Sequence, residues 1–185
     1  MAVIPEWVVP PAQQVADFHH MAYRLADITG TNEAAGQLAA ADWLLGGTRP
    51  APVTHRDDPV TWALVRAESW VALCDAARAA APTPEDWRRL GVAPRDAVAG
   101  NSEWSYGVWR TLSWLLGVRL DPPFELSRRL ADGTIPESEQ RYTLPSRPES
   151  SEWQAGQAHR RERMWAEAVV HWQHVRDRAD ATVIR

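Results

Sequence analysis

Three side chains near the C-terminus have the residue types and the spacing of metal ligands. Glu167, His171 and His174 recur at i, i+4 and i+7, so a helix would place them on one face. Helical bundles that bind metal present such groups from two facing helices, and no second motif of this kind occurs in the chain. Arg163 stands four residues before Glu167, as in an ordinary surface ion pair. We therefore interpret this face as solvated, and we predict neither a metal nor a cofactor.

Nucleophilic and phosphate-transfer mechanisms find little support in the sequence. The only cysteine, Cys74, falls on an apolar helical face, and we interpret it as a small core residue. The Gly-x-Ser-x-Gly, Gly-x-x-x-x-Gly-Lys and Gly-x-Gly-x-x-Gly motifs do not occur, and the absence of lysine excludes a Schiff base. Glu68 lies beside the apolar sector of its helix, where an arginine could pair with it. The sequence therefore favours a non-enzymatic function and predicts no catalytic residue.

Basic side chains gather near the start of the last predicted helix. Arg160, Arg161 and Arg163 form a local patch, and Trp165 follows it. Arginine beside tryptophan can contact phosphates or bases. The whole chain carries a net charge of -4 with 20 basic residues, all arginine, so it has no general attraction to nucleic acid or anionic membranes. Arginine-dependent nucleic-acid binding is therefore our third functional hypothesis.

The eleven tryptophans are the strongest signal of composition. Several must anchor the core, but so many usually leave some at a binding surface. We predict Trp7, Trp70 and Trp165 as binding residues. The leading hypothesis is a protein-binding or assembly protein that contacts a protein partner or itself. The alternative is a small enzyme or ligand-binding domain, with a pocket lined by Trp and by Glu68, His171 or His174.

A helix apolar on almost every side lies at the middle of the chain, from Trp104 towards Pro123. Asn101 or Ser102 can cap it and Gly117 can end it. A helix of this kind belongs in a protein core, because it is too short to span a bilayer, which takes about 20 apolar residues.

The pattern of this central helix has an echo 71 positions earlier. Gly36 aligns with Gly107, and Trp43-Leu44-Leu45-Gly46 aligns with Trp-Leu-Leu-Gly at 114–117. A weaker echo relates the segments around Trp70 and Trp165. The pattern predicts two related helix-turn-helix halves, at about 30–80 and about 101–178; chance similarity between Ala-, Leu- and Trp-rich helices is the alternative.

The rest of the chain completes a single all-α domain of about six or seven helices over residues 1–185. Residues 1–11 read as an extended apolar arm, which packs on its own domain or docks on a neighbouring subunit or partner. Pro59 is placed to begin one helix, and a short helix is expected over 124–130. Residues 132–150 form the longest predicted loop, and the last helix should begin at about Ser151.

No stretch has the length of a membrane span or the pattern of a signal peptide, so the sequence predicts a cytoplasmic protein without a membrane partner. The motif Leu-Ala-Ala-Ala-Asp-Trp-Leu-Leu-Gly-Gly and the later Trp-Arg-Thr-Leu-Ser-Trp-Leu-Leu-Gly-Val resemble those of small α-helical proteins of actinobacteria and their phages. This resemblance covers about residues 30–125. It implies a phage-related or accessory protein, and it assigns no activity and no site residue.

Overall fold

The computed structural model describes residues 4–46, 50–98, 101–126, 133–134 and 151–183, with side chains from 156 to 178 in the last helix. All regular secondary structure in these ranges is helical, which confirms the all-α prediction. The helices are α1 (Ala12–Thr29), α2 (Asn32–Leu44), α3 (Trp62–Ala76), α4 (Pro84–Leu90), α5 (Ser102–Leu115) and α7 (Ser151–Val183).

Short polar residues determine where four of the helices begin, because their side chains accept hydrogen bonds from first-turn N–H groups. Thr31 caps α2, Thr61 caps α3, Thr83 caps α4 and Asn101 caps α5. The predicted cap of the central helix is thus confirmed, whereas α3 begins after Thr61 rather than at Pro59. None of the helices in the described part of the chain is both long and apolar enough to cross a membrane.

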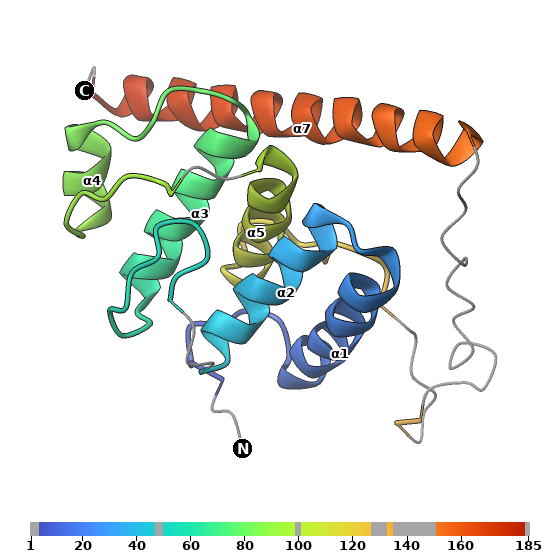
Figure 1. Cartoon of the computed structure of the whole chain (residues 1–185). Coiled ribbons are helices and arrows are strands. Elements are labelled where there is room, and N and C mark those ends of the chain that lie inside the picture. The colour runs from blue at the N-terminus through green and yellow to red at the C-terminus, as the bar shows by residue number, and fades with distance from the viewer. Residues whose placement is uncertain (1–3, 47–49, 99–100, 127–132, 135–150, 184–185) are drawn as a thin grey trace.

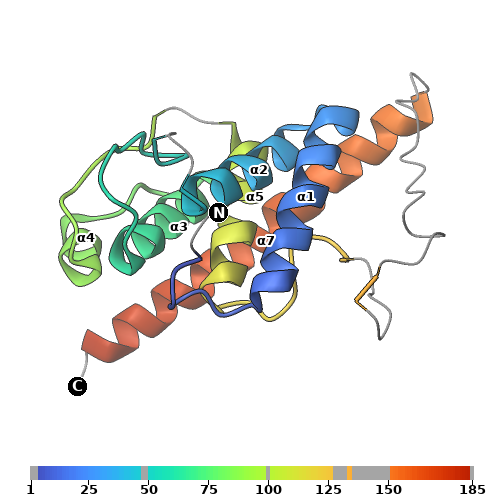
Figure 2. The same ribbon diagram turned by 90° about the horizontal axis from the view of Figure 1, so that it is seen from below.

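Helix α5 lies at the centre of the domain, as its sequence predicts. It packs between α2 and α3, while α1 packs on α2 and α4 on α3. The long helix α7 runs across α3 and α5 (Figures 1 and 2). Trp109, Leu112 and Leu115 of α5 are at most 2% exposed and join Trp43 and Phe18 in the core.

Helices α2 and α5 approach each other so closely that two positions have no room for a Cβ atom. A Cβ on Gly36 would overlap the carbonyl oxygen of Trp104, and a Cβ on Gly107 would overlap that of Glu33. Glycine at both positions therefore allows the backbones to touch. The same crossing brings Glu33 of α2 and Tyr106 of α5 to the lining of one pocket.

Glu68 supports the loop before α3 from inside the core. Its side chain is fully buried and accepts hydrogen bonds from the Val53 N–H (2.6 Å), the Thr54 N–H (2.7 Å) and the Thr54 hydroxyl (2.8 Å). Burial raises the pKa of this carboxyl, and the three hydrogen bonds oppose the rise. Glu68 is thus held by backbone and hydroxyl donors, while Arg56, an arginine of the kind that the sequence suggested, lies near enough to oppose the rise in its pKa as well.

The described part of the N-terminal arm packs on its own domain. Ile4, Trp7 and Val8 lie partly buried against the core, and the Val9 N–H donates to the Leu115 carbonyl at 2.9 Å. Residues 124–126 are not helical, contrary to our expectation, and 127–130 lie outside the described residues. The predicted loop over 132–150 also lies outside them, apart from 133–134.

Candidate functional site

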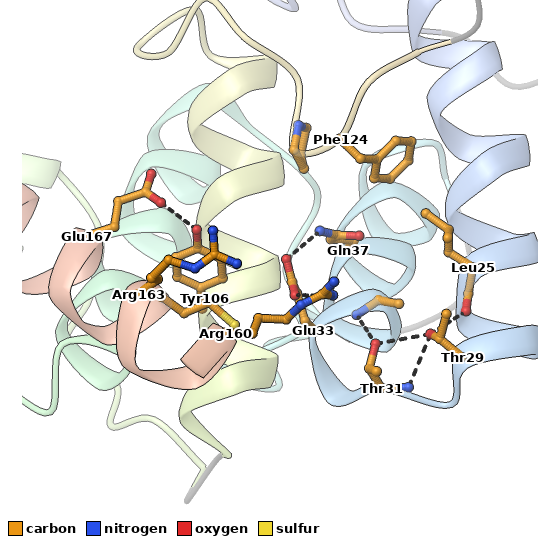
Figure 3. A pocket seen from close by; sticks show the side chains of 13 residues that line it. Leu25, Thr29, Thr31, Glu33, Gln37, Tyr106, Phe124, Arg160, Arg163 and Glu167 are labelled. Carbon is orange, nitrogen blue, oxygen red and sulfur yellow. Dashed lines mark hydrogen bonds and ion pairs between the residues drawn. The ribbon is translucent and has the colours of Figure 1, made fainter. Parts of the chain in front are cut away.

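A pocket of about 480 Å³ lies among α1, α2, α5, the segment after α5, and α7 (Figure 3). We call it the polar pocket. One wall is apolar and is formed by Leu25, Ala34, Pro123, Phe124 and Met164. The other lining side chains are polar or charged: Thr29, Thr31, Glu33, Gln37, Tyr106, Arg160, Arg163 and Glu167. Pockets of this size and mixed character commonly hold small organic ligands.

Two arginines of α7 reach the polar pocket from one face of the helix (Figure 3). The Arg160 Nη1 atom lies 3.6 Å from Glu33 Oε2, so the two charges are close without forming a hydrogen bond. Arg163 forms no hydrogen bond and no ion pair with any residue that the structure describes. The pocket therefore holds one loosely paired guanidinium and one without a counter-ion among these residues.

Glu33 is the partly buried acid of the polar pocket. It stands in the first turn of α2, its side chain is 18% exposed, and its Oε1 accepts a hydrogen bond from the Gln37 amide at 3.3 Å. Burial raises the pKa of Glu33; Arg160 and Arg110 oppose this effect. Since burial prevails over these two cations, the charged form of Glu33 is incompletely compensated in the folded protein.

Glu167 joins α7 to α5 at the edge of the same pocket. Its Oε2 accepts a hydrogen bond from the Tyr106 hydroxyl at 2.6 Å, and its Oε1 pairs with Arg110 at 2.7 Å and Arg119 at 3.0 Å. Asp121 pairs with the same two arginines, at 3.2 and 3.5 Å. The network balances two cations with two anions, and it fixes the Tyr106 ring against the pocket.

Two of the three predicted metal-ligand candidates do not lie on a solvated face, so that interpretation was wrong for Glu167 and His171, whereas His174 is exposed. Glu167 turns inward to the two arginines, and the His171 ring lies 5.1 Å from the Trp109 ring. Burial, Arg119 and His174 lower the pKa of His171. Among the described residues, no group of three His, Cys, Asp or Glu side chains could hold a metal ion.

A second cavity, of about 350 Å³, lies among α3, α4, α5 and α7, and we call it the tryptophan pocket. Trp70, Trp109 and His171 line it, whereas Glu68 and His174, which the ligand-binding hypothesis also named, do not. Arg176 crosses its edge, where its guanidinium pairs with Asp86 at 3.0 Å and lies 5.2 Å from the Trp70 ring. The guanidinium of Arg176 thus already has a carboxylate and an indole as partners.

The other predicted binding residues are dispersed. Trp7, in the N-terminal arm, packs partly buried against the core. Trp165, 49% exposed, donates from its indole N–H to the Ala77 carbonyl at 3.2 Å. Arg161 pairs with Glu103 and does not line the polar pocket, although it shares a small hollow with Trp165. The basic patch of the sequence is therefore divided, with Arg160 and Arg163 on one side of α7.

Sequence reasoning missed Glu33, Gln37 and Tyr106, because none of them belongs to a recognisable motif. The one available signal was indirect. Gly36 and Gly107 align in the sequence echo, and the missed residues stand within three positions of these two glycines. Comparison of the chain with protein-family models, with curated proteins and with solved structures finds no match.

Proposed function

We propose that this chain is a small-molecule-binding protein whose polar pocket receives an anionic group. The observation that carries the proposal is Arg163, a guanidinium that lines the pocket without a counter-ion among the described residues. A carboxylate or phosphate would supply that counter-charge through paired N–H donors. The apolar wall around Phe124 and Met164 offers a surface for the organic part of the ligand.

The local charge balance supports an anion. Glu167 and Asp121 offset Arg110 and Arg119. Glu33 offsets Arg160 when it is ionised, so among the residues that the structure describes the charge of Arg163 is left in excess. A neutral ligand would leave this excess in place, whereas an anion would cancel it.

Calorimetric titration tests the proposal with phenyl phosphate, benzoate and benzyl alcohol as probes. We expect an anionic probe to bind and the alcohol not to bind. Arg163→Gln should weaken anion binding by about tenfold or more, because hydrogen bonds to charged groups are worth about 1.5–3 kcal/mol. Arg161→Gln is the matched control, since this arginine stands on the same helix but faces Glu103. If neither anion binds the wild type, the proposal fails.

The protein-binding function that the sequence favours stays a prediction, with less support from the tryptophans than their number suggested. Of those whose side chains are described, Trp62 and Trp165 alone expose close to half, 47% and 49%. Nucleic-acid binding by Arg160, Arg161 and Arg163 also stays a prediction, and the division of these arginines between two sides of α7 does not favour it. The relation to actinobacterial and phage proteins remains a proposal.

We also propose that α2 and α5 arose by duplication. Gly36 and Gly107 hold equivalent places in the crossing, and the Trp-Leu-Leu-Gly segments both end in a glycine of positive φ, 85° at Gly46 and 71° at Gly117. If the two glycines hold equivalent places, Gly36→Ala and Gly107→Ala should lower the free energy of unfolding by similar amounts.

A further inference from the structure

The polar pocket carries its own anion beside one of the two arginines that a ligand would use. Glu33 Oε2 and Arg160 Nη1 are 3.6 Å apart, which is longer than a direct hydrogen bond. The Arg160 side chain is 51% exposed, so water can replace the carboxylate around it at little cost. Glu33, by contrast, is only 18% exposed, so water compensates its charge poorly once the arginine has left.

The two arginines stand three residues apart on α7, and so project from the same face of one helix. Both line the polar pocket (Figure 3). Two guanidinium groups at this spacing offer more positive charge than one carboxylate needs. A phosphate monoester carries nearly two negative charges at neutral pH, together with three acceptor oxygens.

We propose that the ligand of the polar pocket is a phosphate monoester, and that its phosphate takes Arg160 away from Glu33 when it binds. This inference rests on the proposed small-molecule function. In the empty pocket Glu33 neutralises Arg160. It therefore competes with the phosphate for this arginine and lowers the apparent affinity of the pocket for the phosphate. When the phosphate is bound, its negative charge and that of ionised Glu33 repel each other within one pocket, which favours the protonated form of Glu33.

The charged groups around Glu33 control its protonation. Arg160 and Glu167 face it from α7, and Arg110 and Glu103 face it from α5. Burial already raises the pKa of Glu33, and the loss of Arg160 to a nearby phosphate removes the cation that opposes this rise most strongly. Glu33 therefore takes up a proton as the phosphate binds.

The test is calorimetric titration of the full chain with phenyl phosphate and with benzoate, at pH 7 and in two buffers that differ in ionisation enthalpy. We expect phenyl phosphate to bind the wild type about tenfold more tightly than benzoate, because it engages both arginines. Glu33→Gln should tighten phenyl phosphate binding by about two- to fivefold, since the competitor for Arg160 has lost its charge. On binding phenyl phosphate, the wild type should take up more protons than this variant. Any change in protonation of the phosphate is the same for both proteins and cancels in the difference.

Three results would overturn the inference, and they can be told apart. Weaker binding by Glu33→Gln would mean that the Glu33 carboxylate helps to hold Arg160 in place for the ligand and does not compete with it. Equal affinity for benzoate and phenyl phosphate would reject the phosphate, while the small-molecule function would stand. If both probes fail to bind the wild type, the proposed function is lost as well. If Glu33→Gln does not fold, proton uptake by the wild type is measured at pH 8 instead, where phenyl phosphate, with a second pKa of about 6, is already fully ionised and the proton must go to the protein.

Discussion

Gly36 and Gly107 face each other's helices in the same way. Each packs against the backbone carbonyl that lies three residues before the other glycine: Gly36 against Trp104, and Gly107 against Glu33. The contact is therefore reciprocal, like the isologous contacts of a twofold dimer. It also determines the polar pocket, because it sets how close Glu33 comes to α5.

Alanine at either glycine should destabilise the protein strongly and to a similar extent. The added methyl group would overlap a backbone carbonyl, which cannot rotate away as a side chain could, so the helices must separate. We expect each substitution to lower the free energy of unfolding by about 2–4 kcal/mol, measured in urea. Gly156→Ala is the control: this glycine lies in α7 with open space around it, so alanine should stabilise the protein by about 0.5–1 kcal/mol.

Glu33 should make the stability of the protein depend on pH in an uncommon direction for an acid beside an arginine. Burial raises its pKa above that of the unfolded chain, so the folded state binds the proton more tightly. This contribution to stability is full below the unfolded pKa and is lost as the pH rises through the raised one. Relative to wild type, Glu33→Gln should therefore gain stability between about pH 4 and pH 7, as measured by urea unfolding. If Glu33→Gln instead loses stability relative to wild type as the pH rises, the ion pair of Glu33 with Arg160 outweighs the effect of burial.

Loss of the Glu167 carboxylate should weaken the attachment of α7. Glu167→Gln removes the anion nearest to Arg110 and Arg119, whose side chains are only 11% and 20% exposed. We expect a loss of about 1–3 kcal/mol in the free energy of unfolding. Tyr106→Phe removes one neutral donor and should cost about 1 kcal/mol. In a double-mutant cycle the two effects should not be additive, whereas additive effects would show that the 2.6 Å contact contributes no coupling.

The thiol of Cys74 should be inert in the folded protein. It is 2% exposed, and burial raises its pKa to about 12, so the reactive thiolate is scarce at pH 8. Labelling with an aromatic disulfide should be about a thousandfold slower in native buffer than in urea. Rapid labelling of native protein would mean that the face of α3 around Cys74 opens without global unfolding.

The sequence predicted best what local chemistry controls. The Asn101 cap and the all-round apolar character of α5 are properties of one segment, and both predictions are confirmed. The start of α3 was predicted less well, because Pro59 and Thr61 both carry helix-start signals and only the folded chain selects between them. The solvated face predicted for Glu167 and His171 failed because α7 buries that side against α5.

The polar pocket could not be predicted in the same way. Its acid comes from α2, its hydroxyl from α5 and its arginines from α7, and no spacing along the chain relates the three helices. Arg160 and Arg163 were recognised as binding candidates because they adjoin in sequence. Glu33 looked like any acidic residue in a first helical turn, and its burial depends on a glycine contact between two helices.

The helix α7 forms a wall of both pockets, with Arg163 and Glu167 in one and His171 and Arg176 in the other. An α-helix is a stiff rod, so a displacement at Arg163 reaches His171 two turns away with little loss. The His171 ring rests on the Trp109 ring at 5.1 Å, and its distance from that indole changes with any such movement. A movement of α7 should therefore change the share of Trp109 in the combined emission of the eleven tryptophans, and a variant that lacks this indole would identify that share.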